Sequence, residues 1–242
     1  MKSFDSTFAT PAANLAADEA LLDLCEQHGT EVLRFWESPV PFVVVGYGNR
    51  IAAEVNVPAC AARGVPILRR CSGGGTVVQG PGCLNYAVTL RADEGDEFAT
   101  VTGTNRFVME RNRAALEALM GKSMSVEGCT DLAFHDESHL MKFSGNAQRR
   151  RRNAILFHGT ILHAFDLTLV SELLKTPSKQ PDYRAAREHG AFLANVRVTT
   201  EELKLALTSA WNVDEPLLNP PFAEIEDLAR HRYDTRAWNA DR

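Results

Sequence analysis

One stretch of the chain, residues 66–90, concentrates residue types that suit an anion. Arg69 and Arg70 come shortly before a run of three glycines at positions 73–75. Glycine has no Cβ atom, so the backbone there can approach a bulky ligand and turn several N–H groups toward one point. Guanidinium groups suit phosphate oxygens. The stretch predicts a cradle for a phosphate or acyl phosphate, although glycine clusters also mark plain turns.

The glycine run differs from the familiar nucleotide-binding loops. No Gly-Lys-Ser or Gly-Lys-Thr follows it, so it is not a Walker P-loop. The next residues are Thr76, Val77 and Val78, which favour a strand, whereas a dinucleotide-binding fingerprint continues into a helix. The pattern therefore predicts a loop between two strands.

Lys142 is the strongest candidate for chemistry outside that stretch. It alternates with Met141 and Phe143 in a strand pattern and precedes the small residues Ser144 and Gly145. Lysine is seldom buried without a partner, so this one either faces solvent from an edge strand or has a function. A fixed ammonium suits a reaction in which two anions meet, because it lowers their repulsion.

Together the two stretches resemble the signatures of the lipoate–protein ligase A family, within the biotin/lipoate ligase superfamily. The pattern Arg-Arg-x-Ser-Gly-Gly-Gly-x-Val corresponds to residues 69–77, and Gly-x-x-Asn to 82–85. The second signature, Lys-x-Ser-Gly-x-Ala followed by His-Gly-Thr, corresponds to 142–147 and 158–160. The chain departs from the family at 79–80, where Gln-Gly replaces His-Asp.

The resemblance implies an α+β fold, with a mixed, twisted sheet and flanking helices in one catalytic domain over residues 1–242. It implies a ligase that uses ATP and Mg²⁺ to activate lipoate or octanoate as acyl-AMP and transfers the acyl group to a protein lysine. Lys142 would meet the acyl carboxyl group and the α-phosphate, and Arg70 would hold the adenylate together with residues 75–78. The residues expected to bind the acyl group or ATP are Arg70, Ser72, Gly73, Gly74, Gly75, Thr76, Val77, Val78, Asn85, Asp131, Ser144, Gly145, His158, Gly159 and Thr160.

Three further positions bear on this reading. Asp131 matches the family's Asn-Asp-Leu and would handle Mg²⁺ or phosphate, or it simply begins a strand. The loop at 46–49 corresponds to one that borders the acyl pocket in the family. Cys129 opens an alternative, because octanoyltransferases of the superfamily form an acyl-thioester on a cysteine without ATP. A second alternative is a non-catalytic acyl- or adenylate-binding relative, since Gln79 departs from the pattern.

The resemblance also implies partners. The acceptor would be a lipoyl-accepting domain, of 2-oxoacid dehydrogenase E2 or of the glycine cleavage H protein. The Tyr-Asp-x-x-x-Trp-Asn pattern at 233–239 looks like the end of the catalytic domain. We expect the accessory domain of some ligases to be absent, which leaves room for a separate accessory subunit.

Two charged segments have plain and functional interpretations. The arginines at 149–152 form either a solvated turn or a docking patch for an acidic acceptor domain. The histidines His135 and His139 have helical metal-site spacing, but their flanks are strand-like, so we expect a hairpin turn there.

Composition excludes several classes of protein. A net charge of −5 and a pI near 5.8 argue against general nucleic-acid binding. Five cysteines without a Cys-x-x-Cys pair indicate a reducing compartment, so we expect a cytoplasmic protein. No signal-peptide pattern and no long apolar run is present, so we expect no membrane partner.

Periodicity predicts the elements that must hold these residues. A helix at 11–26 should turn Leu15 and Leu22 inward and Asp18 and Glu19 toward solvent. The irregular segment 176–195 is a candidate for a mobile loop over the site. Further helices are predicted at 57–63, 102–120, 168–174, 200–211 and 221–231. Strands are predicted at 31–36, 41–45, 124–127, 131–134, 140–148 and 154–164.

Overall fold

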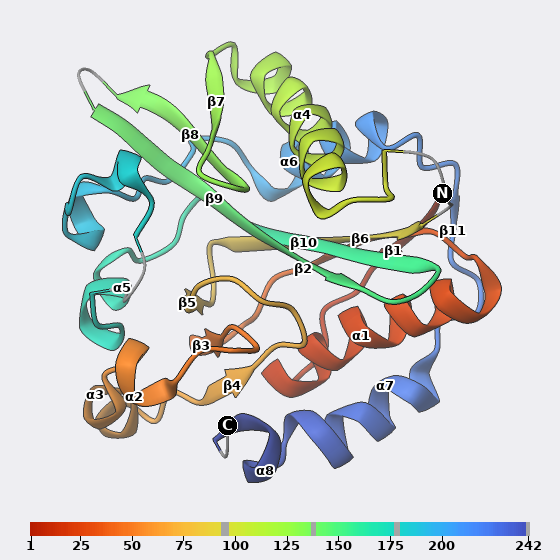
Figure 1. Cartoon of the computed structure of the whole chain (residues 1–242), viewed down its shortest axis with the longest axis horizontal. Helices are drawn as coiled ribbons and strands as arrows, with labels where there is room; N and C mark the ends of the chain where they lie inside the picture. The colour runs from red at the N-terminus through yellow and green to blue at the C-terminus, as the bar shows by residue number, and fades with distance from the viewer. Residues whose placement is uncertain (93–96, 137–138, 177–179, 241–242) are drawn as a thin grey trace.

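The computed structural model describes residues 1–92, 97–136, 139–176 and 180–240. Within these residues, two β-sheets lie at the centre of the fold, with helices around them (Figure 1). The larger sheet contains, in spatial order, β11 (Glu215–Pro216), β1 (Lys2–Asp5), β2 (Val32–Trp36), β6 (Cys83–Arg91), β10 (Ala154–Leu162), β9 (His139–Arg150), β8 (Asp131–Asp136) and β7 (Met124–Glu127). The smaller sheet contains β4 (Ile67–Arg69), β3 (Phe42–Val45) and β5 (Val77–Gln79). Both sheets mix parallel and antiparallel pairs, which confirms the predicted α+β class.

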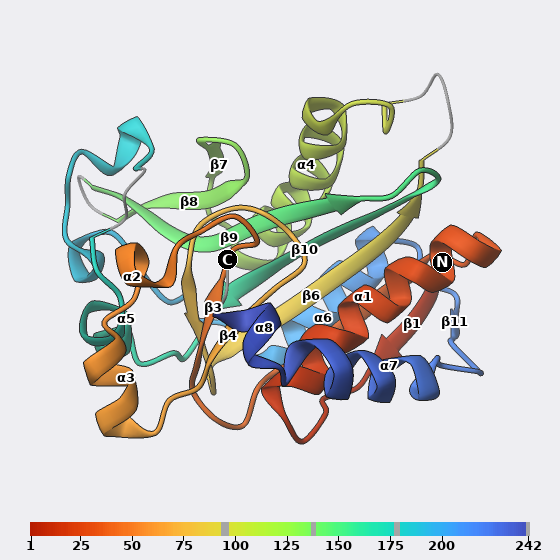
Figure 2. The same cartoon turned by 60° about the horizontal axis from the view of Figure 1, so that its bottom comes forward.

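Helices pack on both faces of the larger sheet (Figure 2). One face carries α4 (Val101–Met120) and α6 (Thr200–Ala210), and the other carries α1 (Pro11–His28) and α7 (Phe222–Leu228). The shorter helical segments are α2 (Ile51–Glu54), α3 (Val57–Arg63), α5 (Thr168–Leu173), α8 (Arg236–Asn239), the 3-10 turns η1 (Asp182–Arg184) and η2 (His189–Ala191), and the π-helical turn η3 (Ala229–Tyr233). Among the described helices, none combines the length and apolar content that crossing a bilayer requires.

Local capping explains where the helices begin and end. The Thr10 side chain accepts a hydrogen bond from the Ala13 N–H at the start of α1, and Gly29 ends the helix in the left-handed region. The Thr199 hydroxyl and the Glu202 carboxylate form a capping box at the start of α6. Because these capping residues can be recognised in the sequence, the predicted helix boundaries are close to those observed. The short helices α2 and α8 were not predicted, since four residues carry too little periodicity.

The solvent-facing side of α1 was predicted wrongly. Asp18 and Glu19 are only 2% and 3% exposed, because α1 is covered by the larger sheet on one side and by α7 and η3 on the other. Arg34 of β2 binds Asp18 at 2.5 Å, and the Tyr233 hydroxyl donates to Glu19 at 2.8 Å. Buried carboxylates need such partners, and a single helix sequence does not reveal them.

Arg69 was also predicted wrongly, as a phosphate-binding group. It is fully buried, and its guanidinium donates to the carbonyls of Gly46 at 3.0 Å, Asn49 at 2.8 Å and Asn239 at 3.1 Å. All of these hydrogen bonds go to backbone carbonyls, so Arg69 connects α8 to the loop after β3 and does not face a ligand.

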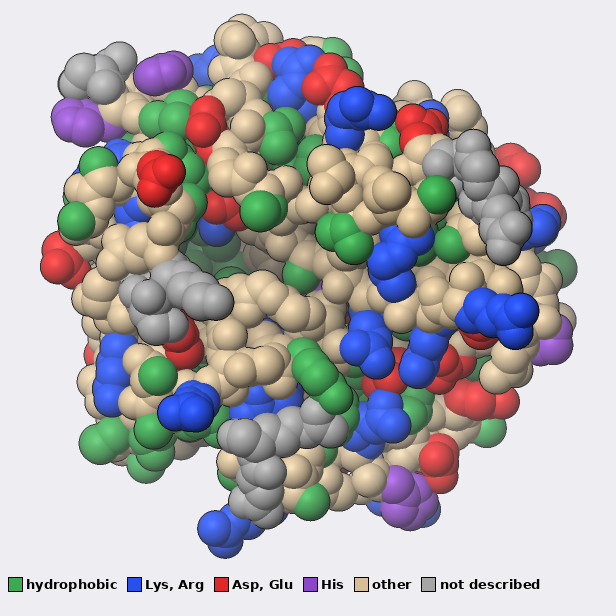
Figure 3. Space-filling model, viewed as in Figure 1, with side chains coloured by type: hydrophobic (Ala, Val, Ile, Leu, Met, Phe, Trp, Pro, Cys, Tyr) green, Lys and Arg blue, Asp and Glu red, His purple; other side chains and the backbone are tan. Residues whose placement is uncertain are grey.

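The arginine segment is only partly a turn, because β9 extends through Arg150. Lys and Arg side chains gather over the end of β9 and over α1 (Figure 3). Arg150 donates to the Thr104 hydroxyl at 3.0 Å, and Arg151 pairs with Asp23 at 2.9 Å. Arg152 is exposed. Most of this charge is engaged within the chain, which favours the structural interpretation over a docking patch.

Gly82, at the start of β6, should tolerate no side chain. Its φ is +85°, and a Cβ atom there would lie 2.2 Å from the Ala164 carbonyl carbon. Gly121 has a φ of +62° but nothing within 4 Å of a Cβ, so it is the matched control. We expect Gly121→Ala to lower the free energy of unfolding by about 1–2 kcal/mol, and Gly82→Ala by about 4 kcal/mol or more. Urea denaturation measures both, and equal losses would contradict the close approach.

Candidate functional site

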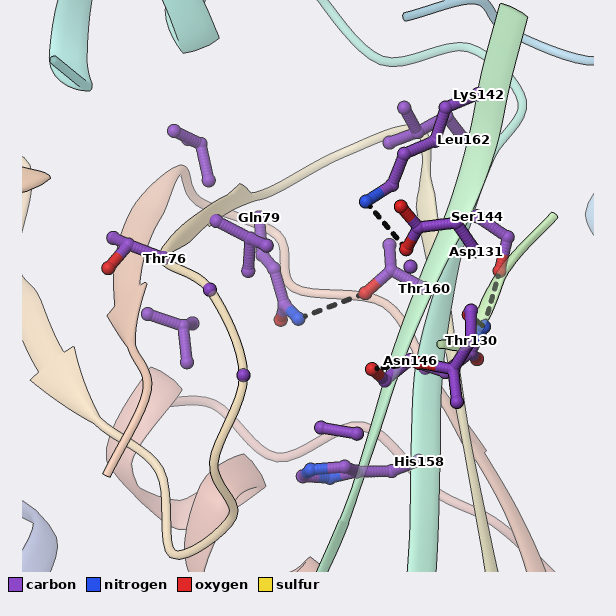
Figure 4. Close-up of a pocket in the computed structure, with 18 of the residues that line it drawn as sticks. Thr76, Gln79, Thr130, Asp131, Lys142, Ser144, Asn146, His158, Thr160 and Leu162 are labelled. Carbon is purple, nitrogen blue, oxygen red and sulfur yellow. Dashed lines mark hydrogen bonds and ion pairs between the residues drawn. The ribbon is translucent and has the colours of Figure 1, made fainter. Parts of the chain in front are cut away.

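A cavity of about 350 Å³ lies between the larger sheet and the loop that joins β4 to β5. Most of the residues predicted to bind substrate line it, although they come from distant parts of the sequence (Figure 4). They are Arg70, Gly74, Gly75, Thr76, Val77, Val78, Asn85, Asp131, Lys142, Ser144, Gly145, His158, Gly159 and Thr160. Ser72 and Gly73 lie outside the lining.

Lys142 reaches into this cavity and pairs with Asp131. Its Nζ atom lies 2.8 Å from Asp131 Oδ1, and the Tyr183 hydroxyl donates to Asp131 Oδ2 at 2.7 Å. Burial, and next the Asp131 carboxylate, raise the pKa of Tyr183, so its hydroxyl stays protonated and donates. The pair places an ammonium at the cavity wall, 23% exposed, where an incoming anion can meet it.

The backbone around Lys142 explains the small residues that follow it. A Cβ atom on Gly145 would lie 2.9 Å from Lys142 Nζ, so a larger residue there would displace the end of the lysine side chain. The Lys142 N–H donates to the Phe192 carbonyl, and the Lys142 carbonyl accepts from the Ala194 N–H, both at 2.9 Å. The strand and the segment after η2 thus hold the lysine from both sides.

Arg70 shapes the glycine-rich loop. Its guanidinium donates to the Ser72 hydroxyl at 3.0 Å and to the carbonyls of Gly73 and Gly75 at 2.6 and 2.8 Å. Burial lowers the pKa of Arg70 to about 10. These bonds bend the loop around the arginine, so the turn that lines the cavity depends on a buried cation.

A buried chain of hydrogen bonds connects this loop to α1. The Ser72 hydroxyl and His158 Nε2 are 2.5 Å apart, and His158 Nδ1 lies 2.9 Å from Asp18 Oδ2. Asp18 in turn accepts from Arg34. The imidazole thus bridges the two groups, with Nδ1 beside the Asp18 carboxylate and Nε2 beside the Ser72 hydroxyl. Ser72 therefore acts on the loop, not on a ligand.

Gln79, the departure from the family pattern, belongs to a second network. Its Nε2 donates to the Thr160 hydroxyl at 3.1 Å, and that hydroxyl donates to Asn85 Oδ1 at 2.7 Å. Gln79 comes from the smaller sheet and the other two from the larger sheet. The network thus joins the two walls of the cavity.

The loop at 46–49 does not line the cavity, contrary to expectation. Asn49 Nδ2 donates to the Gly74 carbonyl at 3.0 Å, and the Tyr47 N–H donates to the Ser72 carbonyl at 2.8 Å. A Cβ on Gly46 would lie 2.1 Å from the Gly74 oxygen. This loop therefore packs directly behind the glycine-rich loop and supports it from outside.

The described part of segment 176–195 forms one side of the cavity. Arg184, His189 and Phe192 belong to the lining. Tyr183 reaches Asp131 from the same segment. The predicted position over the site is confirmed, while residues 177–179 lie outside the described part.

Two possibilities for metal and thiol chemistry were left open by the sequence. The described residues contain no cluster of three or more His, Cys, Asp or Glu side chains that could hold a metal. His139 pairs with Asp136 at the start of β9, as in a hairpin, and the turn residues 137–138 lie outside the described part. Cys129 is exposed in the turn between β7 and β8 and lines the cavity.

Sequence reasoning missed three residues of this site. Asp18 was assigned to the surface, Gln79 was read only as a departure, and Trp36 was placed in a strand without a role. All three line the cavity and are buried. Arg34, an arginine within the otherwise apolar strand β2, was the one sequence signal that could have indicated a buried carboxylate partner such as Asp18.

Comparison with known proteins shows the family to which this chain belongs. The family model of the lipoyl protein ligase A/B catalytic domain matches residues 10–211. The chain belongs to this family and is an enzyme of the lipoate-ligase kind. Lipoate-protein ligase A subunit 1 of Thermoplasma acidophilum is 28% identical, over 93% of this chain and 90% of that protein. Octanoyltransferase LipM of Geobacillus kaustophilus is also 28% identical, over 98% of this chain and 97% of that protein.

Solved structures share the fold at 25% identity. A bipartite lipoate protein ligase of T. acidophilum, studied with its E2 lipoyl domain, has a TM-score of 0.80 over 98% of this chain and 95% of that one. A ligase structure from the same organism with bound lipoic acid has a TM-score of 0.77, over 98% of each chain. A lipoate-protein ligase A with bound ATP has a TM-score of 0.74, over 98% and 96%.

The buried Asp18 should carry much of the site's stability. Asp18→Asn leaves Arg34 buried without its carboxylate, so we expect a loss of about 3–5 kcal/mol in the free energy of unfolding near pH 7. Burial alone would raise the pKa of Asp18, but Arg34 and the His158 hydrogen bond outweigh it and hold the pKa below its ordinary 3.8. The ionised Asp18 carboxylate therefore stabilises the fold fully above its ordinary pKa of 3.8. This stabilisation is lost as the pH falls through the lower pKa that Asp18 has in the folded protein. The difference between wild type and variant should shrink below about pH 4 in urea titrations.

Asp23→Asn is the matched control. Asp23 lies on the same helix as Asp18 and also pairs with an arginine, Arg151, but its side chain is 35% exposed. We expect the control to lose less than about 1 kcal/mol. If the two variants lost the same amount, the buried chain would not have the role assigned to it.

Proposed function

We propose that this chain is an ATP-dependent lipoate–protein ligase, one catalytic domain over residues 1–242, that also accepts octanoate-like acids. The observation that carries the proposal is the Lys142 ammonium, which lies in the cavity opposite the glycine-rich loop and is held by Asp131 at 2.8 Å. Adenylation needs such a group, because an acyl carboxylate and a triphosphate repel each other as they approach.

In the first step the acyl carboxylate oxygen attacks the α-phosphorus of ATP. The bond from that phosphorus to the bridging oxygen breaks, and pyrophosphate leaves with its electron pair. Lys142 stabilises the charge on the attacking carboxyl group and the α-phosphate, and losing one such donor typically costs about 10²–10³ in rate. Residues 75–78 hold the adenylate, and Arg70 contributes through the shape that its hydrogen bonds give to the loop before them.

Asp131 is the carboxylate of this chain that would hold Mg²⁺, which binds through one or two carboxylates together with substrate phosphates. Bound there, the ion would neutralise phosphate charge. Asp131 lines the cavity, and its two oxygens bind Lys142 and Tyr183, so the ion would take the place of one of these partners.

In the second step a lysine amine of the acceptor attacks the acyl carbonyl, an amide bond forms, and AMP leaves. The acceptor is a lipoyl-accepting domain, of the E2 or glycine cleavage H protein kind, and a separate accessory subunit is a second partner. The apolar part of the cavity, with Leu15, Val44 and Leu162 in its lining, receives the acyl chain. Burying about six methylenes at about 0.8 kcal/mol each supplies roughly 5 kcal/mol of affinity.

A cysteine-dependent octanoyl- or lipoyltransferase is the second candidate. One observation favours it: Cys129 is exposed and lines the same cavity as Lys142. In that reaction the Cys129 thiolate would take the acyl group from a carrier, form a thioester, and pass it to the acceptor lysine without ATP.

Two single variants separate the candidates. With ATP, Mg²⁺ and lipoate, we expect the wild type and Cys129→Ser to release pyrophosphate and form lipoyl-AMP. Lys142→Met should lower that rate by about 10²–10³, because the ammonium is lost while the chain length is kept. Pyrophosphate assay and mass spectrometry of the adenylate measure the outcome.

The same preparations test the alternative. Octanoyl label retained on Cys129 of the wild type, with no pyrophosphate release, would replace the ligase by the transferase. Loss of acyl transfer in Cys129→Ser would point the same way. A separate accessory subunit is indicated if adenylate forms but the acyl group does not reach the acceptor domain.

A further inference from the structure

Arg184 is a buried cation in the cavity wall whose charge no described residue balances. It is only 4% exposed, and it forms no ion pair with any described carboxylate. Its Nε atom donates to the Arg187 carbonyl at 2.8 Å, while its two terminal nitrogens donate to none of the described residues. Burial lowers the pKa of Arg184, and the exposed Glu188 offsets this only in part. Buried guanidinium groups normally have partners, because an unpaired buried charge is costly.

The two terminal nitrogens of Arg184 are open to the cavity. Every fully enclosed side-chain polar atom that lacks a partner in the described chain belongs to another residue. The unpartnered nitrogens of Arg184 therefore keep accessible surface, and the residue lines the cavity. Its guanidinium carbon lies 4.9 Å from the centre of the Phe192 ring. Stacking of this kind covers the face of a guanidinium and leaves its N–H edge for a ligand.

Arg187 shows how the same segment holds an arginine that has only a structural role. Its guanidinium donates to the carbonyls of Leu140 at 2.9 Å, Tyr183 at 3.2 Å and Ala191 at 3.2 Å. Its Nε atom donates to the Arg184 carbonyl at 3.0 Å. Arg187 is absent from the described lining of the cavity. Of two arginines three positions apart, one is bound to carbonyls and the other is left for a ligand.

The backbone between these two arginines is strained. Ala185 and Ala186 have φ angles of +51° and +56°, in the left-handed region that residues with a Cβ atom rarely adopt. Such strain persists only where surrounding contacts hold it, and it is concentrated at sites that bind ligands. Holding Arg184 against the cavity accounts for the strain.

The place of Arg184 in the cavity indicates which part of a ligand it meets. Its segment is attached to β9 at Lys142 by two backbone hydrogen bonds. The apolar end of the cavity lies across the larger sheet, where Trp36 of β2 packs in one core cluster with Leu15 and Val44. An acyl chain in that end, with its carboxyl group at Lys142, leaves Arg184 on the far side of the carboxyl group.

His189 shows that Arg184 and Lys142 act on the same part of the cavity. Its side chain is buried in the lining. Burial, and further the positive charges of Arg184 and Lys142, lower the pKa of His189, so the ring is neutral near pH 7. Asp131 balances the charge of Lys142. Arg184 is therefore the unbalanced positive charge on this side of the cavity.

We propose that Arg184 is a further catalytic residue, which binds the phosphate groups of ATP that leave as pyrophosphate. The inference rests on the proposed function in taking ATP as the substrate. The edge of a guanidinium presents paired N–H donors that match two phosphate oxygens. When the bond from the α-phosphorus to the bridging oxygen breaks, its electron pair stays with pyrophosphate. Arg184 stabilises the charge that collects there, while Lys142 meets the carboxyl group and the α-phosphate.

Binding of phosphates to the full chain tests the proposal without relying on turnover. Calorimetric titrations in the presence of Mg²⁺ would compare ATP, pyrophosphate, AMP and octanoate, on the wild type and on Arg184→Met. We expect the variant to bind ATP and pyrophosphate about 10–100-fold more weakly, which is the usual contribution of hydrogen bonds to charged groups. Its affinity for AMP and octanoate should change by less than about twofold, because neither ligand carries the leaving phosphates.

Arg187→Met is the matched control, because it removes the same charge from the same segment. It should leave the ratio of pyrophosphate affinity to AMP affinity unchanged. Urea denaturation separates the two arginines further. Arg187→Met should unfold at lower urea, since it loses its bonds to carbonyls. Arg184→Met should be at least as stable as the wild type, since a buried charge without a partner is removed.

Arg184→Lys is the second variant, should Arg184→Met fail to fold. It keeps a cation but loses the paired donors, so it should retain part of the affinity for pyrophosphate. An unchanged ratio of pyrophosphate to AMP affinity in Arg184→Met would overturn the inference. So would a loss of AMP or octanoate affinity as large as the loss for pyrophosphate, because Arg184 would then meet the α-phosphate or the carboxyl group.

The proposed function fails separately. If the wild type binds ATP through Arg184 but forms no lipoyl-AMP, the ligase is wrong and the phosphate site stands. If lipoyl-AMP forms at the wild-type rate in Arg184→Met, the ligase stands and the inference is wrong. A wild type that binds neither ATP nor pyrophosphate removes both.

Discussion

The site depends first on a buried ion pair, Arg34 with Asp18. Arg34 is fully buried and Asp18 almost so, and each is stable there only because the other is present. Asp18 holds His158, His158 holds Ser72, and Ser72 shares Arg70 with the glycine-rich loop. A charge buried between α1 and the larger sheet thus fixes a flexible turn at the cavity wall.

Opposite that turn, the second ion pair has a different purpose. Lys142 and Asp131 lie where the chain is partly open, and both face the cavity. The screened, accessible pair can exchange partners with an incoming anion, whereas the buried pair cannot. The fold therefore separates the charge that builds the loop from the charge that lines the open part of the cavity.

The sequence predicted the longer helices, most of the strands and most of the cavity lining, because periodicity and the two signatures are local properties. It failed for Asp18, Arg69 and Gln79. Their roles come from partners that lie 16, 170 and 81 positions away along the chain, and no pattern of neighbouring residues reports those. Arg69 and Arg70 illustrate the limit: adjacent in sequence, one supports α8 and the other shapes the cavity loop.

Two segments near the end of the described chain each pack against much earlier parts of the fold (Figure 1). Lys2 and Ser3 pair with Glu215 and Pro216 in the larger sheet, and Arg69 is held by Asn239. One edge of the first strand is therefore covered only after residues 215–216 are available to pair with it. Such non-local pairing slows folding and exposes a strand edge to other chains in the meantime.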